Sequence, residues 1–142
     1  MSALGKDKFV LFPLGERRFA LVAETVKELA QPDTLQVFPH TTPLIAGVLH
    51  RRGRVVPVLD IALILLGPKA PPRKFYLIAN RGFGDTKEWT AVPVTGECEL
   101  MTAKMLPPTG KLPFYVRGLL SLEDEIVEVI DLDRLASGEE AA

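Results

Sequence analysis

The sequence has little of what covalent cross-links, metal centres and catalytic sites are built from. Its 142 residues include one cysteine, Cys98, and two histidines, His40 and His50. A single cysteine cannot form an intrachain disulfide, which favours a reducing, cytoplasmic compartment. These three residues do not stand in a metal-ligand spacing, and Cys98 has no basic neighbour that would lower the pKa of its thiol. We therefore expect no metal, no cofactor and no cysteine-based catalysis.

Long hydrophobic runs and an excess of charge of one sign are also missing. No apolar run approaches the ~20 residues that cross a bilayer, because Pro57 and Asp60 interrupt residues 55–66 and the chain becomes charged at residues 6–8. The 17 Lys and Arg nearly balance the 18 Asp and Glu, for a net charge of −1, which disfavours a broad nucleic-acid-binding face. Residues 82–84 lack the third glycine of a dinucleotide loop. We expect neither membrane insertion nor a nucleic-acid partner.

Short apolar runs of β type, separated by Gly and Pro, dominate what is present. They predict an all-β fold with two short helices at 61–66 and 132–135. Residues 26–29 fit either a strand or a helical turn. Proline-rich joints lie at 67–72 and 107–110. Strands are predicted at 9–12, 18–22, 35–38, 45–50, 54–59, 75–79, 89–94, 116–122 and 125–130.

One segment of the chain is repeated without a gap. Gly47 and Gly118 lie 118 − 47 = 71 residues apart, as do Asp60 and Asp131, and 71 is half of 142. Each copy reads as a strand, a tight turn, a second strand, an Asp and a short helix. Neither half is large enough for much core of its own, so the halves should pack together. The sequence predicts two small β-barrels with a shared seam, and such a seam suits a binding partner.

The repeated aspartates, Asp60 and Asp131, have two interpretations. They could be paired carboxylates for acid/base chemistry. Each stands between a strand and a short helix, however, where a side-chain oxygen can cap the helix for ~1 kcal/mol. The capping interpretation is favoured, because equivalent caps in two copies would not face each other across a substrate.

Three arginines, Arg51, Arg52 and Arg54, surround Gly53 at a predicted hairpin turn. They could form a solvated tip or a small nucleic-acid patch, although the turn carries no aromatic residue for base stacking. Alternatively one of them folds back onto a carboxylate, because the planar guanidinium suits a fixed two-point contact.

These residues resemble the CheW family of chemotaxis coupling proteins. The family's segment is Gly-Val-x-Asn-Leu-Arg-Gly-x-Ile-x-Pro-Val-x-Asp. Here it is Gly47-Val48-Leu49-His50-Arg51-Arg52-Gly53-Arg54-Val55-Val56-Pro57-Val58-Leu59-Asp60. Residues 19–29 and 118–132 match the family's upstream strands and its closing hairpin. His50 and Arg51 replace the family's Asn-Leu, which adds charge to the hairpin. With this departure two interpretations stay open: a standard chemoreceptor array, or a divergent chemosensory pathway such as one controlling surface motility.

The resemblance implies two intertwined, five-stranded, SH3-like β-barrel subdomains within one domain at 8–136, with tails at 1–7 and 137–142. Family members are scaffolds rather than enzymes. They join the cytoplasmic tip of methyl-accepting chemoreceptors to the regulatory domain of the histidine kinase CheA, so recruitment to membrane receptor arrays is expected. The resemblance implies protein-binding roles for Val26, Glu28, Gly47 and Arg52. It gives structural roles to Gly53, Asp60, Gly118 and Asp131. We also expect Arg52 to pair with Glu28.

Overall fold

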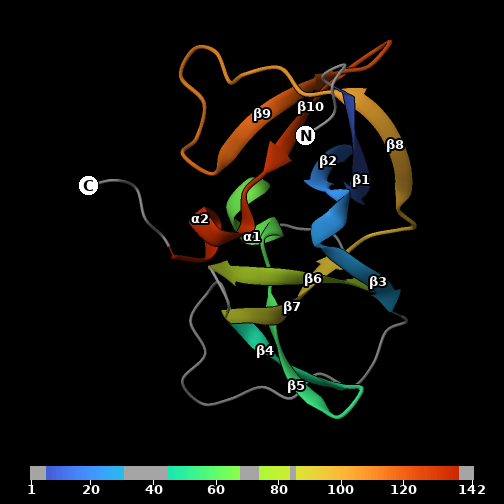
Figure 1. Cartoon of the computed structure of the whole chain (residues 1–142), viewed down its shortest axis with the longest axis vertical. Coiled ribbons are helices and arrows are strands. Elements are labelled where there is room, and N and C mark those ends of the chain that lie inside the picture. Colours follow the sequence, from blue (N-terminus) through green and yellow to red (C-terminus); the bar gives the residue numbers. More distant parts are fainter. Residues whose placement is uncertain (1–5, 31–44, 68–73, 84–85, 138–142) are drawn as a thin grey trace.

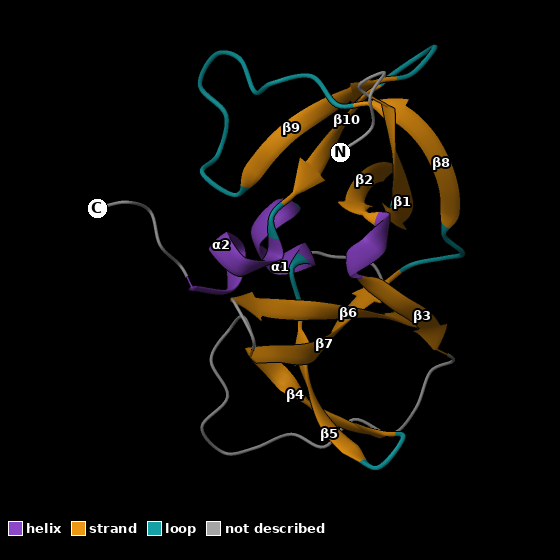
Figure 2. Cartoon of the chain, in the orientation of Figure 1, coloured by secondary structure: helices purple, strands orange, loops and turns teal. Residues whose placement is uncertain are grey.

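The computed structural model describes residues 6–30, 45–67, 74–83 and 86–137 (Figures 1 and 2). The predicted strand at 35–38 lies outside these ranges, and so does the predicted joint at 67–72 apart from Gly67. The elements are β1 (Lys6–Leu14), β2 (Arg17–Val22), the 3-10 helix η1 (Ala23–Thr25), β3 (Val26–Ala30), β4 (Ile45–Arg51), β5 (Arg54–Leu59), α1 (Ala62–Leu65), β6 (Phe75–Phe83), β7 (Thr86–Val94), β8 (Glu99–Lys104), β9 (Val116–Ser121), β10 (Ile126–Ile130) and α2 (Leu132–Ser137).

The strands form two five-stranded sheets, each curled as a small barrel. Barrel 1 has the strand order β3-β6-β7-β5-β4, and barrel 2 has the order β8-β1-β2-β10-β9. Barrel 2 lies above barrel 1 in Figure 1, with α1, α2 and η1 between them. The predicted all-β fold of two SH3-like subdomains is confirmed.

The predicted repeat is present in the backbone. In barrel 1, Gly47 lies opposite Val58; in barrel 2, Gly118 lies opposite Val129, and both partners are shifted by 71. Each ladder also leaves one residue without an opposite partner at the same place: Ala46 in β4, and Arg117, 71 positions later, in β9. Such a match in strand register, including the irregularity, follows from duplication of one unit.

The two halves of the chain exchange hairpins. In barrel 1, β5 pairs in parallel with β7 through Val58 and Ala91. In barrel 2, β10 pairs in parallel with β2 through Val129 and Ala20. The paired residues again differ by 71 (129 − 58 and 91 − 20), so β2 takes in barrel 2 the place that β7 takes in barrel 1. The β1–β2 hairpin of the first half therefore completes barrel 2, and the β6–β7 hairpin of the second half completes barrel 1. The barrels are intertwined and cannot be cut apart at one point of the chain.

Three hydrophobic clusters hold this arrangement. The interior of barrel 1 contains Leu49, Val56 and Val58, and the interior of barrel 2 contains their counterparts 71 residues on, Leu120, Val127 and Val129. A third, central cluster joins the barrels and takes side chains from both. Its members include Phe12, Phe19, Leu59, Ile61, Leu77, Val92, Ile130 and Leu135. The predicted shared core is therefore present.

The helix cap that the sequence predicts at Asp131 is confirmed. Asp131 Oδ1 accepts a hydrogen bond from the backbone N–H of Arg134 at 3.2 Å. Asp60, the equivalent residue before α1, is buried, and its capping role stays a prediction. The two helices also begin at slightly different positions: α2 begins at Leu132, and α1 begins at Ala62, one residue after Ile61, the equivalent of Leu132.

Several boundaries also differ from the sequence prediction. Residues 26–29, which fitted two interpretations, lie in strand β3, and β8 was not predicted as a strand. β1 begins at Lys6 and α2 ends at Ser137, so each extends into a segment that the sequence predicts as a tail.

Candidate protein-docking site

The turn between β4 and β5 has an uncommon backbone. Arg51 lies opposite Arg54 in the ladder, so Arg52 and Gly53 are the two central residues of a tight hairpin. Both have positive φ angles, +50° and +75°, as a type I′ turn requires. A glycine accepts this conformation readily, but for a side chain such as that of Arg52 it costs ~1–2 kcal/mol. Contacts elsewhere must hold Arg52 in place.

Glu28 on β3 provides those contacts. Its carboxylate accepts two hydrogen bonds from Arg51, Nη2 to Oε1 at 2.7 Å and Nε to Oε2 at 3.3 Å. Arg52 also donates, from Nε to Oε2 at 3.0 Å. The predicted pair of Arg52 and Glu28 is thus present, and Arg51, which the sequence did not assign to Glu28, makes the shorter contact. Since β3 and β4 are the two edges of the sheet, this Glu28 clamp joins the edges of barrel 1.

The clamp changes the titration of its carboxylate. Hydrogen bonds from Arg51, and then from Arg52, lower the pKa of Glu28 from 4.5 to about 2. The side chain of Glu28 is 20% exposed and that of Arg52 is 65% exposed. An ion pair this accessible contributes only ~0–1 kcal/mol to stability. Its larger effect is to fix the shape and charge of the hairpin.

The other predicted protein-binding residues lie differently. Val26 is on β3, two residues before Glu28, and packs partly against the central cluster. Gly47 is buried within β4 opposite Val58. The structure therefore brings Glu28 and Arg52 together, places Val26 on the same strand, and leaves Gly47 away from the surface.

Gly118 has a packing role that the sequence did not specify. A Cβ atom there would lie 2.6 Å from Met105 Sδ and 2.8 Å from the carbonyl oxygen of Leu106. Residues 105–106 cross closely over β9, where Leu106 and Leu119 form a β-bridge. Only a glycine allows this crossing, which connects the chain after β8 to β9 and so helps to close barrel 2.

An aromatic surface beside the arginine turn was missed in the sequence. The guanidinium of Arg54 lies 4.2 Å from the ring centroid of Trp89 on β7. These two residues, with Val55, Pro57 and Glu88, line a hollow of about 470 Å³. Trp and Arg are the residues that most often dominate protein–protein binding energy. The available signal was that the chain's single Trp stands in a predicted strand, but its neighbour across the sheet was not foreseeable.

Cys98 and the histidines do not form a reactive site within the described part of the chain. Burial raises the pKa of the Cys98 thiol to about 11, so it is protonated at neutral pH. His50 is exposed, and His40 lies outside the described residues. Among the residues that the structure describes, no group of three or more His, Cys, Asp or Glu side chains is placed to hold a metal ion. No helix in the described ranges is long and apolar enough to cross a membrane.

Comparison with known proteins decides the family. The family model of the CheW-like domain matches residues 8–140. This chain belongs to the CheW-like domain family. It is 22% identical to the probable chemotaxis protein CheW of Rhizobium etli, over 96% of this chain and 92% of that protein. It is 30% identical to protein FrzA of Myxococcus xanthus, over 75% of this chain and 68% of that protein.

A solved structure has the same fold. The crystal structure of the scaffolding protein TtCheW from Thermoanaerobacter tengcongensis superposes with a TM-score of 0.77. The similarity covers 91% of both chains at 23% sequence identity. The CheW fold, with its two SH3-like subdomains, is therefore shared across low sequence identity.

Proposed function

We propose that this CheW-like chain is a non-enzymatic cytoplasmic scaffold that couples chemoreceptors to a CheA-type histidine kinase. The observation that carries the proposal is the family match, which extends over residues 8–140 and so covers both barrels. The fold supports it, because two intertwined barrels offer separate outer surfaces at opposite ends of one rigid core. The partners are the regulatory domain of the kinase and the cytoplasmic tip of a methyl-accepting receptor.

The Glu28 clamp and the neighbouring Trp89 surface form the kinase-binding site in this proposal. Arg52 presents an exposed cation in a fixed direction, and the hollow beside Val55 offers apolar area next to it. Val26 contributes by positioning β3, and Gly47, which is buried opposite Val58, contributes indirectly through the β4–β5 hairpin. A fixed charge beside an apolar hollow favours specificity, because the charge orients the partner while the apolar contact holds it.

The pathway that the scaffold serves has two candidates. The CheW relative of Rhizobium etli is named for chemotaxis, whereas FrzA of Myxococcus xanthus, with a higher identity over a shorter stretch of the chain, is not. The basic pair His50-Arg51 in this chain also departs from the family's Asn-Leu. We therefore include a divergent chemosensory pathway, such as one controlling surface motility, as the second candidate. Genes for the kinase and receptor beside this one would distinguish the two.

A nucleic-acid-binding module remains the alternative from another class. The nearness of Arg54 to Trp89 favours it, because aromatic platforms stack on bases. Two of the three arginines are bound to Glu28, however, and the net charge of the chain is −1. A titration with single-stranded DNA at two salt concentrations tests this alternative, since phosphate binding weakens steeply with salt.

The decisive experiment is a double-mutant cycle on binding to the cognate kinase regulatory domain. Arg52→Asn removes the charge and keeps the turn, because Asn accepts a positive φ and Asn-Gly is the preferred type I′ pair. Glu28→Gln removes the other charge. Each variant should weaken binding several-fold while thermal melts change little, and the double variant should lose less than the sum of the two.

Lys27→Gln provides the matched control, because Lys27 is exposed on the same strand directly beside Glu28. It should bind the kinase domain as the wild type does. Additive losses would show that Arg52 and Glu28 act separately. Unchanged affinity in both single variants would remove the clamp from the interface.

A further inference from the structure

Strand β8 lies at an edge of the barrel 2 sheet, whose strand order is β8-β1-β2-β10-β9. β8 pairs with β1 from Glu99 to Lys104, and no strand of the described residues pairs with its other side. The chain meets β9, the opposite edge, only after β8 has ended, at the bridge between Leu106 and Leu119. An edge strand turns its outward backbone N–H and C=O groups to its surroundings. The six residues of β8 therefore present a row of backbone hydrogen-bonding groups.

The corresponding edge of barrel 1 is closed by the Glu28 clamp. Glu99 on β8 corresponds to Glu28, since 99 − 28 = 71. At the positions of the two clamp arginines, however, barrel 2 has Leu122 and Glu123. A leucine and a like-charged glutamate cannot bind Glu99. Within its described residues, barrel 2 therefore lacks the direct clamp that joins the two edges of barrel 1.

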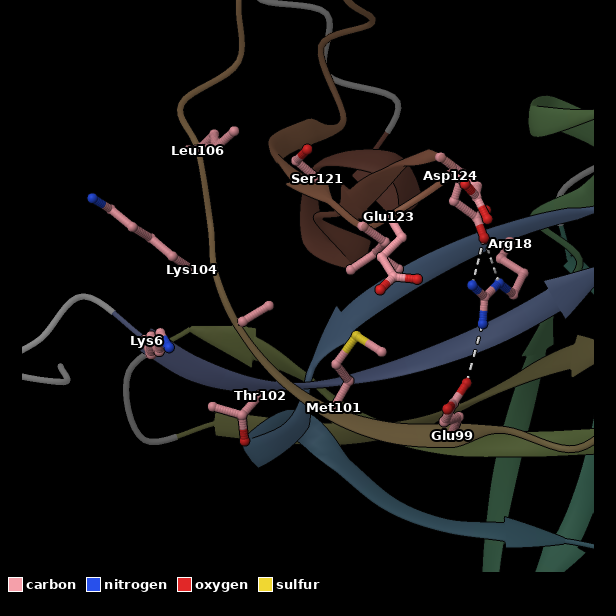
Figure 3. Close-up of a pocket in the computed structure, with 13 residues that line it drawn as sticks. Lys6, Arg18, Glu99, Met101, Thr102, Lys104, Leu106, Ser121, Glu123 and Asp124 are labelled. Carbon is pink, nitrogen blue, oxygen red and sulfur yellow. Dashed lines mark hydrogen bonds and ion pairs between the residues drawn. The ribbon is translucent and has the colours of Figure 1, made fainter.

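A groove of about 750 Å³ runs along the free edge of β8, between this strand and the β9–β10 turn (Figure 3). Arg18 of β2 bounds one end, where it binds Glu99 at 3.1 Å and also binds Glu125 of the turn. The backbone bridge of Leu106 bounds the other end. Ligand-binding clefts usually have volumes of roughly 300–1,000 Å³, so the groove is large enough for a short extended peptide.

The floor of the groove is apolar. Met101 and Ala103 of β8 and Leu122 of the turn line the groove and pack against the interior cluster of barrel 2. Met101 and Ala103 are two residues apart in the strand, so their side chains lie on one face of the sheet. A strand added beside β8 would place every second side chain next to this pair. The groove therefore suits a segment with apolar residues at alternate positions.

Two lysines lie next to each other at the Leu106 end of the groove. Lys6 and Lys104 are directly opposite in the β1–β8 ladder, and both are exposed. Like charges at directly opposite positions destabilise a strand pair. Neither lysine forms an ion pair with another residue of the described ranges. An acidic group from another molecule would remove this repulsion.

The other end of the groove has the opposite charge. Glu123 and Asp124 lie there, beside Arg18 (Figure 3). Arg18 is already bound to Glu99 and Glu125, whereas Glu123 and Asp124 form no ion pair within the described part of the chain. This end therefore suits a basic group. Since the groove is lined by three cations and four carboxylates, it favours a ligand with both charges at a fixed spacing rather than a ligand of high net charge.

We propose that the free edge of β8 binds an extended segment of a partner protein by strand addition. The segment pairs antiparallel to β8, the more stable of the two arrangements. An acidic residue of the partner lies against Lys6 and Lys104. A basic residue five positions later, the length of β8 from Lys104 back to Glu99 (104 − 99 = 5), lies against Glu123 and Asp124. Backbone hydrogen bonds give such a complex its affinity, and the side-chain contacts give it specificity.

This binding is independent of the coupling function proposed above. The Glu28 clamp and the Trp89 surface belong to barrel 1, whereas the β8 groove belongs to barrel 2 at the other end of the molecule (Figure 1). One chain can therefore bind a kinase domain and an extended segment at the same time. The groove would recruit a further protein to the scaffold through a short linear sequence.

The probe for this site is the synthetic peptide Glu-Val-Thr-Val-Thr-Arg, blocked at both ends and carrying a fluorophore. In the antiparallel register its Glu lies opposite Lys104 and its Arg lies opposite Glu99. Its two Val residues lie opposite Ala103 and Met101. Fluorescence anisotropy with the full chain should show saturable binding at submillimolar concentration. In NMR spectra the amide resonances of β8 should shift, while those of the β4–β5 turn should stay in place.

Two N-methylated peptides test whether the backbone pairs. One carries methyl groups on the amide nitrogens of its second and fourth residues, and the other carries them on its third and fifth. In an added strand only one of these two sets of N–H groups faces β8. One methylated peptide should therefore bind several-fold more weakly than the parent, and the other should bind as the parent does. Equal affinity of all three peptides would overturn strand addition.

Charge reversal tests the register. Lys104→Glu should weaken binding of the parent peptide several-fold, and a peptide with Lys in place of its Glu should bind this variant better than it binds the wild type. Glu123→Lys should also weaken binding of the parent. Lys74→Glu, at an exposed position before β6, is the control with the same change of net charge as Lys104→Glu, and it should bind as the wild type does. Thermal melts of the variants separate a loss of binding from a loss of folding.

The peptide with the reversed sequence, Arg-Thr-Val-Thr-Val-Glu, has the same composition and tests the direction. It should bind several-fold more weakly than the parent, because its charges meet like charges in the antiparallel register. Equal affinity of the two sequences would overturn the proposal, as would the absence of β8 amide shifts or unchanged affinity in both Lys104→Glu and Glu123→Lys. None of these results bears on kinase binding, which is measured separately.

Discussion

Glu28 and Glu99 occupy equivalent positions in the two barrels, yet they are bound by arginines from different parts of the sheet. Glu28 is held by Arg51 and Arg52 from the opposite edge of its barrel. Glu99 is held by Arg18 from an interior strand. Barrel 1 is consequently closed near the β4–β5 turn by the side chains of the Glu28 clamp. Barrel 2 is closed further from its β9–β10 turn, by the backbone bridge between Leu106 and Leu119. One duplicated frame thus presents two chemically different ends.

The titration of Glu28 should report directly on the clamp. Its pKa of about 2 results from the hydrogen bonds of Arg51 first and Arg52 second. The carboxyl resonance of Glu28 in an NMR titration should therefore move to a midpoint near this value in the wild type. In Arg51→Gln the midpoint should rise toward 4.5, and in Arg52→Asn it should rise less. A wild-type midpoint near 4.5 would show that the clamp does not form in solution.

The same pKa gives a pH dependence of stability with a definite sign. Because the folded-state pKa of Glu28 is depressed, the contribution of the clamp is fully present above about pH 4.5 and is lost as the pH falls through about 2. The free energy of unfolding of wild type minus that of Glu28→Gln should be largest near neutral pH and should lose more than half of its pH-dependent part by about pH 3. Urea unfolding of both proteins across this range measures it. A difference that grows on acidification would contradict the assignment.

Cys98 should react slowly with alkylating reagents in the folded protein. Its pKa of about 11, compared with an ordinary 9.0, lowers the thiolate fraction about a hundredfold, and the thiolate is the reactive form. Iodoacetamide labelling at mildly alkaline pH, followed by mass spectrometry, should be slow until urea unfolds the chain. Cys98→Ser should retain kinase binding. Rapid labelling of folded protein would indicate an activated thiol.

Gly118→Ala should destabilise the protein by ~1–3 kcal/mol, the usual cost of overpacking. The new methyl group would meet the backbone oxygen of Leu106 at 2.8 Å, and backbone moves less easily than a side-chain end. Gly96→Ala is the matched control, because its Cβ would lie 3.4 Å from Pro13 Cγ at the closest. Thermal unfolding of the two variants compares them. Equal melting temperatures would mean that residues 105–106 do not cross tightly over β9.

Local patterns in the sequence were sufficient to predict the duplicated hairpins but not how they are exchanged. The segments 45–65 and 116–136 have the same length, so the repeat is visible without gaps. The outer hairpins hide it, because Ala20 pairs with Leu11, nine residues back, whereas Ala91 pairs with Ile78, thirteen residues back. The four additional residues in the β6–β7 hairpin break the register. Which hairpin joins which barrel depends on long-range packing that no local pattern contains.

The missed strand β8 shows a second limit. Its residues mix charged and apolar side chains, and most of them are exposed, as suits an edge strand with one covered face. Its burial pattern is too weak to be recognised alone. The repeat nevertheless contained the information, because adding 71 to residues 28–30 of β3 gives residues 99–101 of β8. The Arg51 contact was missed for a different reason: the sequence gives the turn residues, but only the twist of the hairpin determines which arginine reaches Glu28 first.

The central cluster predicts that the two barrels unfold as one unit. Leu49 in barrel 1 and Leu120 in barrel 2 are equivalent and fully buried, so Leu49→Ala and Leu120→Ala should each cost ~2–5 kcal/mol. Trp89 is the only tryptophan of the chain and lies in barrel 1, so its fluorescence reports on that barrel alone. Far-ultraviolet circular dichroism reports on both barrels.

In urea titrations, Leu120→Ala should therefore shift the Trp89 fluorescence transition as much as the circular dichroism transition, although the mutated side chain lies in the other barrel. The reason is that Phe12 and Phe19 of barrel 2 pack in one cluster with Leu77 and Val92 of barrel 1, and each barrel is completed by a hairpin from the other half of the chain. Loss of either barrel removes side chains from the cluster on which the other depends. Pro57→Ala, a change on the partly exposed hollow of barrel 1, controls for local effects near Trp89. If Leu120→Ala instead leaves the fluorescence midpoint unchanged while circular dichroism shows an early partial transition, the barrels unfold independently and the central cluster does not couple them.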